Sequence, residues 1–233
     1  MSESEERVGA LSRLALLVPG EHDTTGVLLQ LMSTATDVLN VAGAAVTVVA
    51  HGRSEVVGAT VDLLAEVEGA QHDYSRGPGV DALRWGESVA VPDVRAQWVR
   101  WPEYITVALR HGVSAVAQIP MRLGGEQVGA LGLFTDRPRA WTGEDLSMAA
   151  LLAGMAAGHL LTADALRRQQ ELAEQLQHAL SSRIVVEQAK GVLAGTHNIT
   201  PEAAYELIRG HARRRRITVQ EVARAIVELG LRP

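Results

Sequence analysis

The stretch from Ser182 to Leu229 constrains the fold most, because its apolar residues repeat with a helical period and its breaks carry helix start and stop signals. We expect a first helix to end at Gly195, since glycine readily takes the left-handed conformation that closes a helix. Thr200-Pro201 is typical of the first residues of a second helix. Thr218, followed by Glu221, predicts a capping box that opens a third helix.

The segment before these helices predicts one long helix, because no glycine occurs between Ala165 and Gly191. Its apolar residues are spaced by seven, three and four, as in a coiled-coil seam: Leu166, Ala173, Leu176 and Leu180. Its opposite face is polar: Arg167, Arg168, Glu171, Glu174 and Gln175. We expect the seam to pair two chains; the alternative is a helix that lies on its own domain.

Charge divides the chain into two parts. Residues 1–164 hold 11 Arg against 20 Asp and Glu, a net charge of −9, whereas the remaining residues hold 11 Lys and Arg against 7 Glu, a net charge of +4. The acidic part is unsuited to non-specific nucleic-acid binding, and the basic part fits a surface that contacts phosphates. Lys190, the only lysine of the chain, lies in the basic part.

The residues indicate neither an enzyme nor a cofactor protein. The chain has no cysteine, and its 8 histidines form no ligand pair at metal-binding spacing. No phosphate-binding glycine loop and no nucleophile motif is present. The acidic segment from Met1 to Glu6 is unlike a signal peptide, and the apolar stretch from Leu146 to Leu161 is short for a membrane span. We therefore expect a cytoplasmic protein with no metal, no cofactor and no catalytic residues.

The first part of the chain predicts an α+β domain with an antiparallel sheet flanked by helices. The expected helices are Arg7 to Val18, Thr25 to Leu39, Val61 to Glu68, Val80 to Arg84, one that ends near His111-Gly112, and Thr142 to Leu161. The expected strands are Ala44 to Ala50, Val56 to Thr60, Ser88 to Val91, Ala115 to Met121 and Gln127 to Thr135. A turn at His51 to Ser54 joins the first strand pair, and Gly124-Gly125 joins the last.

Aromatic residues gather in the segment from Tyr74 to Arg110, which together with the sheet would wall a small-molecule pocket. The candidate lining residues are Tyr74, Trp98, Trp101 and Tyr104. Two other interpretations stay open: these aromatics are ordinary core, or the domain binds no ligand and serves as a dimerisation platform.

The C-terminal stretch resembles the ANTAR domain, a three-helix RNA-binding module of bacterial antiterminators. The residues that carry the resemblance are Leu180 to Leu193 with Arg183 and Ala189-Lys190-Gly191, then Ala203, Tyr205, Leu207 and Arg209, then Val219 and Glu221 to Ala223. Two positions depart from the family pattern: Ala194 stands where methionine is usual, and Arg216-Ile217-Thr218 stands where a polar Asn and basic residues are usual.

The resemblance implies an RNA-binding surface. Arg183 and Lys190 are two helical turns apart on one face, and Gly191 leaves room for a backbone to approach. Arginine can bind phosphate bidentately or stack on the unpaired bases of an RNA loop. We add the arginines of the second helix to the expected surface: Arg209, Arg213 and Arg214.

The first part resembles a GAF domain, a small-molecule-sensing relative of the PAS fold, from about Thr25 to Leu161. The residues that carry this are Gly77-Pro78-Gly79, Val89 to Asp93, Trp101 to Tyr104, Gly112 to Ala115, Ile119-Pro120, Gly129 to Leu133 and Phe134. Some GAF domains hold bilins or redox centres, or reduce methionine sulfoxide, through cysteine. A chain without cysteine cannot do so.

These expectations combine into one domain plan: an N-terminal segment (1–24), a GAF-like sensor (25–162), a coiled-coil linker helix (163–182) and an ANTAR domain (183–230). The resemblance implies a homodimeric antitermination regulator that binds tandem stem-loops in nascent leader RNA and prevents a terminator from forming. Two alternatives stay open. A three-helix basic module also describes a DNA-binding helix-turn-helix, and a GAF domain can serve protein interaction without nucleic acid.

Overall fold

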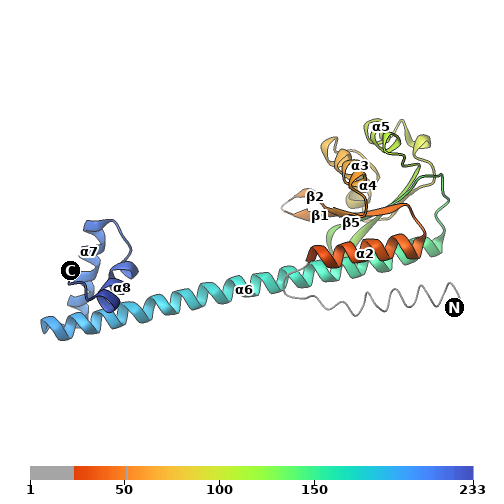
Figure 1. The fold of residues 1–233 in the computed structure, drawn as a ribbon. Helices are drawn as coiled ribbons and strands as arrows, with labels where there is room; N and C mark the ends of the chain where they lie inside the picture. The colour runs from red at the N-terminus through yellow and green to blue at the C-terminus, as the bar shows by residue number, and fades with distance from the viewer. Residues whose placement is uncertain (1–23, 51, 233) are drawn as a thin grey trace. The chain divides into compact units, whose positions relative to one another are not determined.

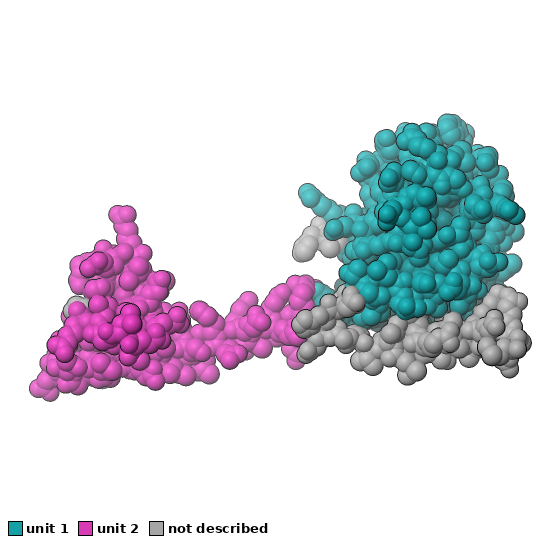
Figure 2. All heavy atoms as spheres, in the orientation of Figure 1, with its two compact units in different colours: residues 1–165 teal, residues 166–233 magenta. Residues whose placement is uncertain are grey.

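The computed structural model describes residues 24–50 and 52–232 and divides into two compact units, residues 1–165 and residues 166–233 (Figure 2). The helix expected from Arg7 to Val18 lies outside the described residues. Unit 1 contains the sheet, and unit 2 contains only helices.

Unit 1 is built on a five-stranded antiparallel sheet in the order β2-β1-β5-β4-β3. The strands are β1 (Gly43–Ala50), β2 (Arg53–Ala59), β3 (Val89–Val91), β4 (Ala115–Leu123) and β5 (Glu126–Thr135). The sequence predicted all five strands and placed the shortest at an edge, where β3 lies. The predicted and observed first residues differ most for β2. This strand begins at Arg53 and not at Val56, because Arg53 continues the ladder opposite Ala50.

Helices cover both faces of this sheet (Figure 1). One face carries α2 (Thr24–Leu39) and the first turns of α6 (Gly143–His197); the other carries α3 (Asp62–Asp73), α4 (Pro78–Trp85) and α5 (Pro102–Arg110). A short 3-10 helix, η1 (Val94–Gln97), follows β3. Because side chains alternate across a strand, Ala117 and Ile119 of β4 enter the α2 and α6 core, whereas Val116 enters the α3 to α5 core. The expected α+β architecture is confirmed.

Two helices of unit 1 are longer than predicted. Helix α3 continues past Glu68 to Asp73, because its third turn buries Gln71 against α4. Helix α4 begins at Pro78 and not at Val80, since proline suits a first helical position, where its missing N–H needs no partner. Residues 74–77 alone therefore separate the two helices.

Helix α6 is the largest departure from the expected boundaries, because neither Leu161 nor Gly195 ends it and it continues to His197. Asn198 closes the helix with a left-handed backbone (φ 51°), and the N–H of Ile199 donates to the carbonyl of Ala194 at 3.2 Å. Among the described residues, α6 is also the one helix long and apolar enough to cross a membrane by length and composition. The helix is longer than the apolar stretch from Leu146 to Leu161, but one such helix is weak evidence for a membrane span.

Two more helices complete unit 2: α7 (Pro201–Arg215) and α8 (Val219–Leu229). Their predicted starts are confirmed. The Thr200 side chain accepts from the N–H of Ala203, and Thr218 and Glu221 form the expected reciprocal capping box. Helix α7 ends at Arg216, which takes a left-handed backbone conformation (φ 56°), and α8 ends at Gly230.

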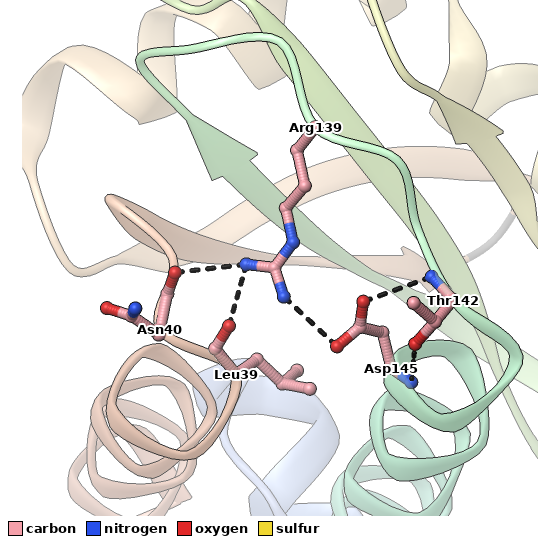
Figure 3. A network of polar contacts seen from close by, with 5 residues as sticks. All are labelled: Leu39, Asn40, Arg139, Thr142 and Asp145. Atoms are coloured by element: carbon pink, nitrogen blue, oxygen red, sulfur yellow. Dashed lines mark hydrogen bonds and ion pairs between the residues drawn. The ribbon is translucent and has the colours of Figure 1, made fainter.

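Arg139 connects the end of α2 to the beginning of α6 (Figure 3). Its Nη1 donates to the carbonyls of Leu39 (2.7 Å) and Asn40 (3.0 Å), and its Nη2 lies 3.0 Å from Oδ1 of Asp145. Asp145 in turn accepts from the N–H of Thr142 and completes the predicted capping box. One guanidinium therefore satisfies carbonyls at a helix C-terminus and orients the carboxylate that caps the next helix.

We expect Arg139→Ala to lower the free energy of unfolding by about 1–3 kcal/mol, because it leaves helix-end carbonyls and a cap carboxylate without their charged donor. Denaturant unfolding followed by circular dichroism measures this. Arg137→Ala is the matched control, since Arg137 is exposed and its backbone carbonyl, not its side chain, accepts from Thr135. Equal stability of the two variants would contradict the role of Arg139.

Candidate nucleic-acid interface and a buried polar cluster

The core of unit 2 fixes which side chains of its three helical segments face outward. Its buried residues come from the end of α6, from α7 and from α8: Ala189, Leu193, Ala204, Ile208, Ala212, Val222, Ala223 and Ile226. Alanine at half of these positions lets the helices approach closely. The charged residues of the three segments are consequently left on the outside.

The predicted residues of α6 lie beside this core. Arg183 is exposed, and within the described residues it makes no ion pair. Lys190 is half-buried, and its Nζ lies 2.9 Å from both carboxylate oxygens of Glu187. Gly191 is exposed and has open space where a side chain would stand. Arg183 therefore presents its charge to solvent, whereas the charge of Lys190 is held by a neighbour one turn away.

The predicted arginines of α7 also differ in how far they are exposed to solvent. Arg209 is half-buried, and its Nη2 lies 2.6 Å from Oε2 of Glu206. Arg213 and Arg214 are exposed. The guanidinium of Arg214 lies back over Gly210, since a Cβ built there would be 3.5 Å from its Nη1. Together with Arg215 and Arg216, these residues form a run of exposed cations at the end of α7.

The four aromatic residues predicted to line a pocket differ in how far they are buried. Trp101 and Tyr104 are buried and pack edge to face with ring centroids 6.5 Å apart, whereas Tyr74 and Trp98 are about half exposed. A cavity of about 190 Å³ does exist in unit 1, but its lining includes none of the four. It lies between the start of α3 and the ends of α5 and β5, next to Leu63, Leu64, His111, Val113, Phe134 and Asp136.

A buried polar cluster that the sequence did not predict lies between α3 and the sheet and consists of Glu68, Gln71, Thr47 and Gln118. One Glu68 oxygen accepts from Nε2 of Gln118, and the other accepts from Nε2 of Gln71 (2.8 Å) and from the Thr47 hydroxyl (3.2 Å). All four side chains are buried. The sequence did carry a signal, because Gln118 is a polar residue at an inward position of an otherwise apolar strand.

Burial dominates the electrostatics of this cluster. It raises the pKa of Glu68 from 4.5 to about 7, although the hydrogen bonds from Gln118, Thr47 and Gln71 act in the opposite direction. Burial also raises the pKa of Tyr104, and the negative charge of Glu68 adds to this effect. The pKa of His72, whose ring lies 3.4 Å from the Thr47 hydroxyl, is lowered by burial.

The raised pKa of Glu68 predicts a stability that depends on pH. Because the folded-state pKa is above the unfolded value, Glu68 favours the folded state below about pH 4.5, and this contribution disappears as the pH rises through about 7. We expect the wild-type chain to lose up to about 3 kcal/mol of stability relative to Glu68→Gln between about pH 5 and about pH 8. Denaturant unfolding at a series of pH values tests this, with the exposed Glu87→Gln as control. Parallel wild-type and Glu68→Gln profiles would contradict the prediction.

Comparison with known families agrees with this architecture. The family model of the GAF domain matches residues 21–161, and that of the ANTAR domain matches residues 174–227. No curated protein matches the chain. The expectation from the sequence, a GAF domain followed by an ANTAR domain, is therefore confirmed.

Solved structures share the fold of the first unit at low identity. The GAF domain of a phosphoenolpyruvate-protein phosphotransferase from Coxiella burnetii is 14% identical with a TM-score of 0.56, and covers 72% of this chain and 99% of its own. The corresponding domain from Acinetobacter is 12% identical with a TM-score of 0.55, at 71% and 97% coverage. The free methionine-R-sulfoxide reductase from Neisseria meningitidis is 14% identical with a TM-score of 0.53, at 70% and 91% coverage. These similarities establish the fold alone.

The sheet with helices on both faces, and the basic helical unit that follows it in the chain, define a sensor domain joined to an output module. The chain belongs to the GAF family and carries an ANTAR domain after its GAF domain, which is the architecture of the signal-responsive ANTAR regulators. Both are regulatory classes of domain, although the fold of the first unit also occurs in an enzyme, the methionine-R-sulfoxide reductase above.

Proposed function

We propose that this chain is a transcription antitermination regulator whose ANTAR domain binds tandem stem-loops in nascent leader RNA and keeps a terminator hairpin from forming. The observation that carries the proposal is the ANTAR match over residues 174–227, together with the basic residues that the three helical segments leave on their outside. Binding to transcripts as they are made places the protein in the cytoplasm.

The proposed RNA surface consists of Arg183, Lys190 and Gly191 on α6 and of Arg209, Arg213 and Arg214 on α7. Arg183, Arg213 and Arg214 are exposed and reach solvent with their charge. Lys190 and Arg209 each pair with a glutamate one turn earlier on the same helix. The glutamate side chain of each pair is 58% exposed, so water screens both pairs and an RNA phosphate can replace the carboxylate. We assign these two residues to phosphate contacts and the exposed arginines to contacts with loop phosphates or bases.

Removing two of these charges should weaken RNA binding and reduce its salt dependence. We expect Arg183→Ala with Lys190→Ala to lower the log–log salt slope by up to about 1.4, at about 0.7 per lost phosphate contact on single-stranded RNA. Affinity for a tandem-hairpin leader RNA, measured at several salt concentrations, tests this. Arg224→Ala with Arg232→Ala is the control, because it removes the same charge from unit 2 outside the proposed surface.

The same measurement separates the proposal from its rivals. Competition by duplex DNA that exceeds competition by hairpin RNA would favour a DNA-binding regulator. Failure of the wild-type chain to bind either nucleic acid would contradict the proposal and favour a protein-interaction module. Equal loss of affinity in the α6 variant and in its control would leave RNA binding intact but remove Arg183 and Lys190 from the surface.

We further propose that two chains pair through the linker helix, as binding to two stem-loops requires two RNA-binding faces. Two leucines of the predicted seam in this linker are solvent-exposed: Leu176 is 62% exposed and Leu180 is 61% exposed. A second helix with the same seam would cover them. Pairing there would also give the GAF domains a route to change how the two RNA-binding faces are presented.

Leu176→Glu should therefore convert a dimer into a monomer, because it places a charge in the proposed seam. Sedimentation velocity of the full chain measures the change. Gln175→Glu is the matched control, since it introduces the same charge at the adjacent residue on the polar face. A Leu176→Glu chain that remains a dimer would exclude this seam as the principal contact.

A further inference from the structure

The polar cluster of Glu68, Gln71, Thr47 and Gln118 buries a carboxyl group without a cationic partner. Glu68 is 2% exposed, and its hydrogen-bond donors within the described residues are two amides and a hydroxyl. Unlike Asp81 of α4, whose carboxylate lies 2.8 Å from Arg100, Glu68 has no ion pair in the described part of the chain. A charged carboxylate in such surroundings is costly, so the site favours uptake of a proton.

Few other ionisable groups compete at this site. The titratable residues that face Glu68 are His72 on its own helix, through Thr47, and Tyr104 on α5. Strands β1, β4 and β5 present Thr47, Gln118 and Gly132, which do not titrate. Helix α4 approaches with the backbone of Gly79, whose N–H donates to Gln71 at 2.6 Å. A proton that arrives here therefore binds to Glu68.

The cluster has no space for a larger ligand. A Cβ added to Gly132 would lie 2.8 Å from Oε1 of Glu68, and one added to Gly77 would lie 2.5 Å from Oε1 of Gln71. At Gly79 the nearest Gln71 atoms would be 2.9 Å away. Since even a methyl group does not fit at these three positions, the ligand that can enter without repacking the domain is a proton.

Protonation would rearrange the hydrogen bonds of the cluster. The charged carboxylate only accepts, whereas the neutral acid must donate one hydrogen bond. Oε1 of Gln118 is buried and has no partner among the described residues. If the Gln118 amide turns over, this oxygen accepts the new O–H. The neutral state thus reverses the hydrogen bond between these two side chains: Oε1 of Gln118 accepts from Glu68, and Nε2 of Gln118 no longer donates to it.

The rearranged side chain belongs to the strand that supports α6. Gln118 points to one face of β4, and its neighbours Ala117 and Ile119 enter the opposite core, where they join Ala153 and Ala156 of α6. A change in the hydrogen bonds of Gln118 therefore acts on β4 next to the two residues that pack against the first turns of α6. Helix α6 continues into the ANTAR domain.

We propose that the signal sensed by this GAF domain is the proton, and that Glu68 is the group that binds it. The neutral and charged forms of Glu68 would hold β4 in two hydrogen-bonding states and so change the presentation of the RNA-binding surface. The link to RNA rests on the proposed function, whereas proton binding by Glu68 does not.

The direct test is a carbon-13 NMR titration of the side-chain carboxyl of Glu68 in the full-length wild-type chain. Its resonance is assigned through the Glu68 backbone, so no variant is required. We expect a titration midpoint between about pH 6 and about pH 8, against about 4.3 for a glutamate side chain in a model peptide. A Glu68 midpoint below about pH 5.5 would overturn the proposal.

The functional test compares RNA affinity of the wild-type chain and Glu68→Gln at about pH 6 and about pH 8. We expect the wild-type affinity to change at least about fivefold, a typical size for coupling between two sites. Glu68→Gln mimics the neutral acid, so at both pH values it should keep the wild-type affinity of the acidic condition. Glu87→Gln should follow the wild type.

The two tests distinguish failure of the inference from failure of the proposed function. A chain that binds RNA equally at both pH values, in all three forms, would overturn proton sensing and leave RNA binding standing. A chain that binds no RNA but shows the expected Glu68 midpoint would overturn the proposed function and support proton binding at Glu68. If Glu68→Gln fails to fold, the wild-type titration decides alone.

Discussion

Close packing of α6 against the sheet is the contact on which both units depend. The first turns of α6 meet the α2-side core with small side chains at spacings of three and four: Ala149, Ala153, Ala156 and Ala157, with Leu152 between them. Alanine has no side chain beyond Cβ, so the helix can lie close to the strands. Arg139 fixes the start of this helix by joining its N-terminal cap to the end of α2. The same helix then supplies Ala189 and Leu193 to the core of unit 2.

The opposite face of the sheet is built differently. The core there is apolar around Phe134, Tyr104 and Ile105, but it contains amide and carboxyl groups that hydrogen-bond to one another around Glu68. Such a polar group in a core stabilises the fold only if its partners stay in place. A single proton changes which of these groups donates and which accepts. The proposed proton sensing therefore rests on this cluster.

Local sequence signals predicted most of the elements, because each acts within a few residues. The glycine pair at Gly124-Gly125, the capping boxes at Thr142 and Thr218, and the helical apolar periods all gave elements at the expected places. Signals that depend on tertiary contacts were missed. Gly195 is a residue type that often ends a helix, yet α6 continues past it to His197. Ala189 and Leu193 pack in the core of unit 2, and the residue with the left-handed backbone is Asn198.

The candidate sites show the same division. The charges on α6 and α7 follow from helical period alone, so the sequence could propose them, but it could not show that Lys190 and Arg209 are held by Glu187 and Glu206. The polar cluster needs three elements far apart in the chain: β1, α3 and β4. No local pattern brings them together, and Gln118 was the one residue whose polarity marked the place.

The measurement that tests the central claim most directly is crosslinking of the protein to cellular RNA, followed by sequencing of the RNA that it retains. The account predicts reads that cluster in leader regions with tandem stem-loops, and that disappear with Arg183→Ala and Lys190→Ala in a chain that still folds. Reads spread evenly over transcripts, or retention that does not depend on these two residues, would contradict it.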